Sequence, residues 1–320
     1  MHALLSALFS MALLLVPVSS MAQTYPDKPI KLIVPFAAGG GLDATARFLG
    51  IHLSKVLGQT IFVDNKPGAN GQLGVAGAVG SAPDGYTLLF VNGSPLSVRP
   101  HMFKTGYDPM IDLAPISMIA TNDFVIAVNP SMPAKDAKEF LAAIKTSPGK
   151  YFYASTGVGS EGQLGFELLK QSGGFDIGHV PFTGDAVGIP NVVNGSVHMI
   201  MTLVPTAQPF FDTDRLRPIA STGEQRLVQR PDLPTMTELG FPVVAGSWFG
   251  LYAPAKTPQA IITKVDQAMK TVLESAEVQR QFATWGTRLA YGPPDVLARK
   301  LRQEFETQGK VIRAAKISAE

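Results

Sequence analysis

The chain has 320 residues, of which 46% are hydrophobic and 16% charged, and its formal net charge is +2. This length is sufficient to bury one large core or two smaller ones. The small excess of Lys and Arg forms no basic run, which argues against nucleic acid as a partner. The absence of cysteine excludes disulfides, thiol nucleophiles, iron–sulfur clusters and cysteine-based zinc sites.

The first segment has the pattern of a targeting sequence. Residues 3–18 are nearly all apolar, and Ser20 and Ala22 place small residues three and one positions before an expected cleavage after Ala22. The alternative is an uncleaved membrane anchor, because the segment before the apolar run carries only His2 and no Lys or Arg. The run is shorter than the roughly 18–20 residues that span a bilayer. We therefore expect residues 1–22 to be a cleaved signal peptide and the mature protein to be exported and soluble.

The next stretch predicts a strand, a glycine loop and the start of a helix. The apolar run 32–34 is followed by Pro35, which has no N–H to continue a ladder, and by glycines at 39–41. A helical pattern starts at Asp43 or Ala44 and ends near Gly58. Glycines let a backbone approach a ligand, and free N–H groups at a helix N-terminus face an anion. The stretch is either an anion-binding loop or a βα turn that binds nothing, and Asp43 is either a ligand contact or a helix cap.

Further along, the pattern continues as β-α-β. A short strand at 61–63, a glycine-rich loop at 65–71, a small-residue helix at 75–79 and a strand at 86–91 follow in order. This alternation predicts a mainly parallel sheet covered on both faces.

The second half repeats the arrangement. Strand material at 116–128 contains a polar interruption at 121–123, and a helix follows at 136–145, where Asp136 and Glu139 have capping-box spacing. A strand at 151–154 then leads into the second glycine loop, 155–160, and a helix for which Ser160 and Gln163 have capping-box spacing. Four strands and three helices complete the expected order. The strands are at 178–182, 197–201, 218–221 and 248–253; the helices are a short one capped by Thr235 and Glu238, one at 258–274 and an amphipathic one at 294–315.

The two glycine loops predict a clamp. Ligands of open α/β sheets lie at the carboxyl ends of the strands, so two such domains facing each other would place one loop on each side of a cleft. A small anion between two helix N-termini is held by backbone N–H and hydroxyl groups without Arg or Lys.

Competing chemistries have weaker support. The spacing Gly157-x-Gly159-x-x-Gly162, with Asp176 about 20 residues on, matches the dinucleotide fingerprint of an exported NAD-binding oxidoreductase. However, Asp176 follows a Gly-Gly turn and does not end a clear second strand. The histidines have no metal-site spacing, and there is no GxSxG or Walker A sequence. We therefore expect no catalytic residue, no metal and no cofactor.

Eight motifs occur in order after the signal segment, and with them the chain resembles the Bug-type substrate-binding receptors of tripartite tricarboxylate transporters. They are YPDKPI at 25–30, Pro35-Phe36 with Gly39-Gly40 and Asp43, NKPGA at 65–69, APDGYTL at 82–88, STGVGS at 155–160, HVPF at 179–182, PDLPT at 231–235 and SWFGL at 247–251.

The resemblance implies an α/β protein of the two-domain periplasmic-binding-protein type (type II, Venus flytrap), with a mixed, mainly parallel sheet in each domain and the ligand cleft between them. Residues 23–122 plus 249–320 would form the first domain and 123–248 the second. It further implies a monomeric periplasmic receptor that captures a small carboxylate and delivers it to a two-component membrane permease, without enzymatic activity. Two alternatives remain. One is a receptor that passes its signal to a sensor kinase instead of a permease, and the other is a structural export protein without a ligand.

In this family the two glycine loops hold the ligand carboxylate. With the neighbouring strand ends, the expected ligand-binding residues are Phe36, Ala37, Ala38, Gly39, Gly40, Asp43, Ser94, Ser155, Thr156, Gly157, Gly159, Ser160, Gln163, Phe182, Thr183 and Thr202.

The chain departs from the family pattern where specificity is set. Ala37 and Ala38 replace common prolines, Gln163 replaces a common His, and Thr202 stands where relatives often carry an Asp that can meet a ligand ammonium. Because Thr202 cannot form that ion pair, we expect a ligand with an uncharged or aromatic tail, or with a second carboxylate, rather than an amino acid.

Overall fold

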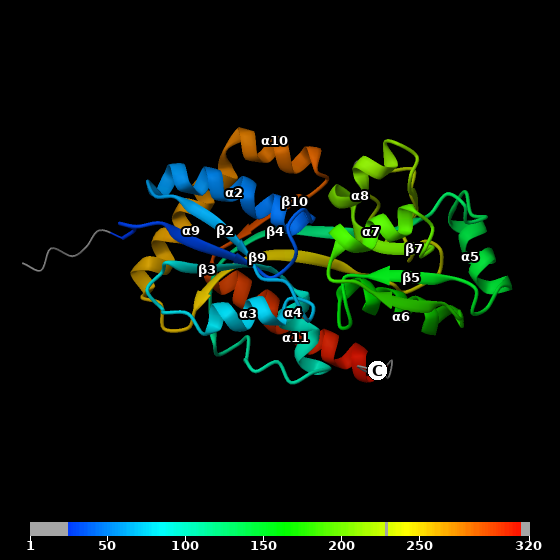
Figure 1. Cartoon of the computed structure of the whole chain (residues 1–320), viewed down its shortest axis with the longest axis horizontal. Helices are drawn as coiled ribbons and strands as arrows, with labels where there is room; N and C mark the ends of the chain where they lie inside the picture. The colour runs from blue at the N-terminus through cyan, green and yellow to red at the C-terminus, as the bar shows by residue number, and fades with distance from the viewer. Residues whose placement is uncertain (1–24, 228–229, 315–320) are drawn as a thin grey trace, which may run out of the picture.

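The structure, a computed structural model, describes residues 25–227 and 230–314. The expected signal peptide and its cleavage after Ala22 lie outside these residues. Within them, no helix is long and apolar enough to cross a membrane. Figure 1 shows two lobes side by side, which we call the first lobe (left) and the second lobe (right), joined by long strands that run from one to the other.

The first lobe is built on the predicted β-α-β-α-β segment. Its first strand pairs in parallel with the second on one side and with the third on the other. The first helix starts at Gly41, slightly earlier than expected, and ends at Gly58, whose φ of 72° is the left-handed conformation that glycine adopts readily. The elements are β1 (Ile30–Val34), α2 (Gly41–Leu57), β2 (Ile61–Asn65), α3 (Gln72–Val79), β3 (Thr87–Asn92), α4 (Ser94–Ser97) and the 3-10 turn η2 (Arg99–His101).

Two strands cross between the lobes. β4 (Leu113–Val128) is continuous over 16 residues, so the expected interruption at 121–123 is wrong. The polar residues there do not break the strand because their backbone stays paired with β9 (Gly246–Pro254) as far as Asp123. From Phe124 onward β4 pairs with β7 of the second lobe instead. One strand therefore serves both lobes.

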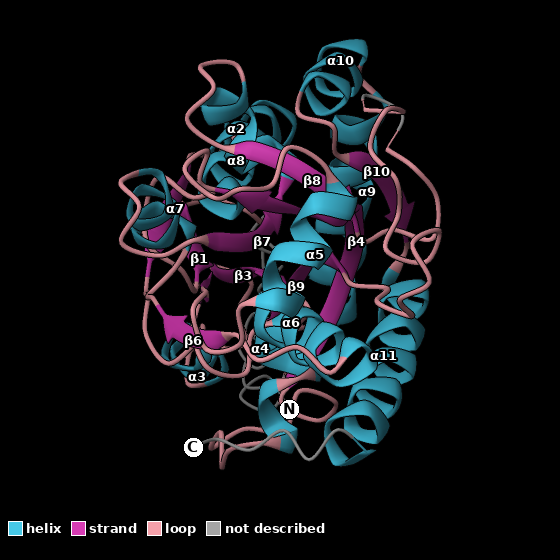
Figure 2. Ribbon diagram, turned by 90° about the vertical axis from the view of Figure 1, so that its right-hand side faces the viewer, coloured by secondary structure: helices cyan, strands magenta, loops and turns pink. Residues whose placement is uncertain are grey.

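The second lobe repeats a smaller parallel unit, seen from its own side in Figure 2 with α5 and α6 in front of the strands. The side chain of Asp136 accepts from the Glu139 N–H at 2.8 Å, which confirms the predicted cap of α5. Two helices, α7 and α8, were not expected, because each contains a proline that argues against a helix interior. The elements are α5 (Ala137–Thr146), β5 (Phe152–Ser155), α6 (Glu161–Gly173), β6 (Gly178–Pro181), α7 (Asp185–Val193), β7 (Met199–Leu203), α8 (Val204–Phe211) and β8 (Arg217–Ser221).

The sheet is mixed but less parallel than predicted. The ladders β2-β1-β3 and β7-β5-β6 are parallel, as the sequence indicated. All described ladders made by β4 or β9 are antiparallel; β4 crosses from the first lobe to the second, and β9 pairs with it in the opposite direction on its way back. "Mainly parallel" therefore holds only for the ladders β2-β1-β3 and β7-β5-β6.

The C-terminal part returns to the first lobe. The amphipathic pattern predicted for the last helix is confirmed, since Leu297 and Leu301 are buried. Near its end, Ile312 forms a small apolar cluster with Val98 and with Leu164 of the second lobe. The elements are α9 (Gln259–Glu274), α10 (Ala276–Thr284), β10 (Arg288–Gly292) and α11 (Pro294–Ala314).

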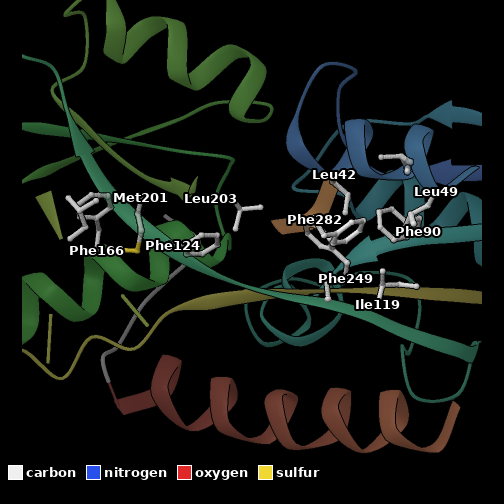
Figure 3. Close-up of a cluster of buried hydrophobic side chains, with 14 of the residues drawn as sticks. Leu42, Leu49, Phe90, Ile119, Phe124, Phe166, Met201, Leu203, Phe249 and Phe282 are labelled. Atoms are coloured by element: carbon white, nitrogen blue, oxygen red, sulfur yellow. The ribbon is translucent and has the colours of Figure 1, made fainter. Parts of the chain in front are cut away.

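The main core extends from one lobe to the other along β4 and β9. Figure 3 shows Phe124, Met201 and Leu203 on the second-lobe side and Leu42 and Phe249 on the first-lobe side, with the crossing strands between them. These same side chains also line the cleft described below. The apolar floor of the cleft is thus the surface of the core.

Candidate functional site

A cavity lies between the lobes, where both glycine loops and the crossing strands meet. Its walls come from the first loop and the N-terminus of α2, the end of β3, the second loop and α6, the end of β7 and the N-terminus of α7. The lining residues are Phe36, Ala37, Gly40, Gly41, Leu42, Asp43, Asn92, Ser94, Phe124, Thr156, Glu161, Gly162, Gly184, Asp185, Ala186, Met201, Thr202, Leu203, Ser247 and Phe249.

The first loop is fixed by one buried carboxylate. Asp43 Oδ2 accepts from the Gly39 N–H at 2.9 Å, and Asp43 Oδ1 accepts from Asn65 Nδ2 at 2.9 Å. Asn65 Nδ2 also donates to the Phe36 carbonyl, and Arg47 pairs with Asp43 at 3.0 Å. Although burial opposes ionisation, these hydrogen bonds lower the pKa of Asp43. Both Asp43 oxygens are occupied by the protein, so its role is to shape the loop.

The second loop is fixed by side chains of its own lobe. Ser155 Oγ lies 2.6 Å from His179 Nε2, and Gln163 Oε1 accepts from the Gly159 N–H at 2.7 Å. Ser160 caps α6 by accepting from the Gln163 N–H, as predicted. Burial lowers the pKa of His179 to about 4, so its ring is neutral near neutral pH. Ser155, Ser160 and Gln163 therefore hold the loop.

The lobes meet directly across the second loop. The Gly159 carbonyl accepts from Asn70 Nδ2 at 2.8 Å and from Ser94 Oγ at 3.0 Å, both from the first lobe. Arg99 Nη1 donates to the neighbouring Val158 carbonyl at 3.1 Å. These bonds join the two lobes across the cleft.

Two helix N-termini open into the cavity without a side-chain cap. α2 begins after Gly40 and α7 begins after Gly184, and neither N-cap residue makes a side-chain hydrogen bond. Their first N–H groups and the positive end of each helix dipole are suited to an anion. For the first loop, this arrangement supports the anion-binding alternative over the empty βα turn.

A polar wall that the sequence did not reveal lies at the end of β7 and the start of α7. The Thr202 hydroxyl lies close to the carboxyl of Asp185, yet Thr202 Oγ1 and Asp185 Oδ1 are shielded from solvent and make no well-formed hydrogen bond within the described structure. Burial raises the pKa of Asp185 to about 6, which the Thr202 hydroxyl only partly offsets. Thr202 does not lack a neighbouring carboxylate, because Asp185 supplies one from another element.

A second buried acid, Glu161, stands at the start of α6. It is 4% exposed, and the Ser247 hydroxyl and the Ser94 N–H lie beside its carboxyl, although Oε1 makes no well-formed hydrogen bond within the described residues. Burial and the nearby Glu304 raise the pKa of Glu161 well above its ordinary value. Glu304 itself is engaged by Trp248 Nε1 and by Lys300 at 3.1 Å.

The structure brings together part of the predicted set. Seven predicted residues line the cavity: Phe36, Ala37, Gly40, Asp43, Ser94, Thr156 and Thr202. Gly157, Phe182 and Thr183 line an adjoining cavity that also touches Phe36. The remaining predicted residues do not line the cavity: Ala38, Gly39, Ser155, Gly159, Ser160 and Gln163.

The residues that the sequence missed become neighbours only through the fold. Asn92 and Ser247 come from β3 and β9, and Glu161 and Asp185 start two different helices. An acid at a helix start normally indicates only a favourable charge near the dipole, so no local signal separated Asp185 from a capping residue. Within the described residues, no group of three His, Asp or Glu side chains is arranged to hold a metal ion.

Comparison with known proteins gives a consistent result. The chain matches the tripartite tricarboxylate transporter family receptor over residues 45–317. It is 33% identical over 300 residues to the protein BugT of Bordetella pertussis, covering 93% of this chain and 91% of that protein.

Two solved structures resemble the fold closely. Rpa4515 of R. palustris with adipate is 29% identical with a TM-score of 0.89, covering 92% of this chain and 99% of that one. MatC from Rhodopseudomonas palustris with bound malate is 28% identical with a TM-score of 0.84, covering 90% and 100%.

Proposed function

Because the chain belongs to the tripartite tricarboxylate transporter receptor family, we propose that it is a periplasmic receptor that captures a small carboxylate and delivers it to a membrane permease. It performs no chemistry on the ligand, needs no cofactor or metal, and acts as a monomer after its signal peptide is cleaved near Ala22. Residues 23–122 plus 249–320 form one domain and 123–248 the other.

One observation carries the proposal: the uncapped N-termini of α2 and α7 open into one cavity between the lobes. A carboxylate there would receive backbone N–H groups from both lobes, so its binding would favour the closed arrangement. The adipate and malate bound to the two related proteins support the class of ligand.

The dinucleotide alternative has a geometric weakness. In a dinucleotide site the acid that binds the ribose follows the second strand, at the same sheet edge as the glycine loop. Here Asp176 precedes β6, and its carbonyl accepts from Gly149 at the opposite edge. The alternative of a structural protein without a ligand predicts an apolar, closed seam, whereas the lining of this cavity includes the polar side chains of Asn92, Glu161 and Asp185.

A thermal-shift screen tests the proposal. Ligand that binds only the folded receptor stabilises it by RT ln(1 + [L]/Kd), about 2.7 kcal/mol at 100-fold excess over Kd. We expect at least one small organic acid to raise Tm, and NAD to leave it unchanged. A shift with NAD and none with any carboxylate would establish the enzyme reading.

Delivery needs a separate test. Deletion of the gene should abolish uptake of the acid identified in the screen. Intact uptake with loss of a transcriptional response to that acid would favour a receptor for a sensor kinase.

A further inference from the structure

Two buried carboxyl groups from different lobes lie near each other beside the cavity. Glu161 starts α6 of the second lobe, and Glu304 lies on α11, which runs from the first lobe toward α6 (Figure 1). Glu161 is 4% exposed and Glu304 is 9% exposed. Among the described residues, the cation closest to the two acids is Lys300, which pairs with Glu304 at 3.1 Å. Two acids therefore share one ammonium group at this junction of the lobes.

The first lobe covers Glu161. The Ser94 N–H, at the start of α4, and the Ser247 hydroxyl, from the crossing strand β9, lie beside its carboxyl. The backbone at Gly93 also approaches so closely that a Cβ atom there would lie 2.8 Å from Glu161 Oε1. Separation of the lobes would remove Gly93 and Ser94 from Glu161 and admit water to its carboxyl. The burial of Glu161 is therefore a consequence of closure.

The surroundings of the two acids are unequal. Glu304 accepts a hydrogen bond from Trp248 Nε1 and has Lys300 as an ion-pair partner, and both suit a charged carboxylate. A second negative charge buried next to it, on Glu161, would be costly because no further cation compensates it. Burial and the charge of Glu304 accordingly raise the pKa of Glu161 well above its ordinary value.

We propose that Glu161 takes up a proton when the two lobes close, so that lower pH favours closure and, with it, capture of the ligand. The part about capture rests on the proposed receptor function, whereas closure can be measured without a ligand. Between the ordinary pKa of an exposed carboxyl group and the raised pKa of the closed state, the open receptor has lost the proton that the closed receptor holds. Closure therefore weakens as pH rises through this range.

The other ionisable groups around Glu161 belong to separate interactions. Asp43 lines the cavity from α2 and pairs with Arg47 of its own lobe. Tyr252, on β9, stays neutral because burial raises the pKa of its hydroxyl well above its ordinary value. Asp185 lines the cavity from α7, and burial raises its pKa to about 6. Because Asp185 could titrate in the same range, the measurements are made both in the natural protein and with Asp185→Asn in every variant.

Energy transfer between two dyes measures closure in the ligand-free receptor. The chain contains no cysteine, so Lys55→Cys on α2 and Lys138→Cys on α5, both exposed, provide the two labelling sites. Single-molecule measurements across a pH series give the populations of the closed and open receptor. We expect the ratio of closed to open to fall by up to about tenfold per pH unit, as the uptake of one proton requires. A ratio that does not change with pH would overturn the proposal.

Variants assign the proton to its carboxyl group. Glu161→Gln keeps the shape of the side chain but cannot ionise, so the closed population should no longer fall as pH rises. Glu304→Gln removes the neighbouring negative charge, so the fall should become smaller. Glu306→Gln, an exposed acid on the same helix, is the matched control and should behave like its parent. An undiminished pH dependence in Glu161→Gln would mean that another group takes up the proton, and the proposal would fail.

A binding measurement separates this inference from the receptor function. Calorimetric titration with malate and with adipate, in two buffers of different ionisation enthalpy, counts the protons taken up on binding. We expect uptake approaching about one proton in the Asp185→Asn parent and none from this site in Glu161→Gln. Binding with equal proton uptake in both proteins would overturn the inference and leave the receptor function intact. If neither acid binds and closure still depends on pH through Glu161, the inference on closure stands without support for the receptor function.

Discussion

The two glycine loops look alike in sequence but are held differently. The first loop is fixed within its own lobe by Asp43, whose oxygens bind Gly39, Asn65 and Arg47. The second loop is fixed on one side by its own lobe and on the other by Asn70 and Ser94 across the cleft. The first loop therefore keeps its supporting bonds without the other lobe, whereas the second loop has all of its bonds only when the two lobes are in contact.

The largest expected effect comes from removing the support of the first loop. Asp43→Ala leaves the Gly39 N–H and the Asn65 amide without their acceptor, and we expect a loss of about 4 kcal/mol in the free energy of unfolding, since hydrogen bonds to charged groups contribute about 1.5–3 kcal/mol each. Urea denaturation measures this. The matched control is Asp295→Ala, an exposed acid in an i,i+4 pair with Arg299, where surface pairs contribute about 0–1 kcal/mol. Equal losses in both variants would show that Asp43 does not organise the loop.

Removal of the Asp185 carboxylate, in the polar wall beside Thr202, should change stability in the opposite direction. Burial raises the pKa of Asp185 to about 6 in the folded state. At pH values between its ordinary pKa and about 6, the folded protein therefore binds a proton that the unfolded chain has lost, and stability falls as pH rises through this range. Above about pH 6, Asp185→Asn should stabilise the empty receptor by up to about 3 kcal/mol, at 1.36 kcal/mol per pKa unit. Below the unfolded pKa the gain should vanish. Thermal unfolding of both proteins across this pH range measures the gain in stability. A gain that does not depend on pH would mean that ionisation of Asp185 is not its cause.

Breaking the contact across the cleft should affect binding more than folding. Asn70→Ala removes the 2.8 Å bond to the Gly159 carbonyl, so the closed state loses part of its support. We expect ligand affinity to fall by about 2 kcal/mol, or roughly 30-fold. Asn191→Ala is the control, because that side chain bonds only within α7. An unchanged affinity in Asn70→Ala would mean that closure does not depend on this bond.

The smallest effect separates lining from supporting residues in the second loop. Thr156 lines the cavity, whereas Ser155 bonds with His179 behind it. Thr156→Ala should weaken ligand binding by about 1 kcal/mol with little change in stability, and Ser155→Ala should mainly lower stability, because a partner is left unpaired. Titration and urea denaturation of both variants test the distinction. Unchanged affinity in both variants would mean that the ligand does not bind at the second loop.

Local chemistry explains what the sequence could predict. The order of strands and helices around Pro35, the capping of α5 and α6, and the amphipathic α11 all follow from short-range patterns, and the structure confirms them. The continuous β4 was missed because the polar residues 121–123 resemble a break, although pairing with β9 keeps them extended. The helix α7 was missed because Pro190 lies inside it.

The candidate site also has parts that local sequence predicts and parts that depend on the fold. A glycine loop can be predicted from a short stretch of sequence, because the residues that allow a close backbone approach lie within the loop itself. Asp185 lies beside Thr202 because β7 and α7 meet at one edge of the sheet, and no short sequence motif predicts that contact. Hence the two glycine loops of the cleft were predicted from the sequence, whereas the position of Asp185 beside Thr202 was not.

The contact between α11 and the second lobe bears on how long a ligand remains bound. Ile312 packs with Leu164 across the lobes, and this contact and the bonds to the Gly159 carbonyl involve no ligand atom. Separation of the lobes breaks these same contacts whatever ligand is bound, so they add an equal contribution to the barrier for release of each ligand. A permease that drew the end of α11 away from Leu164 would shorten the residence time of any cargo without touching the cargo itself.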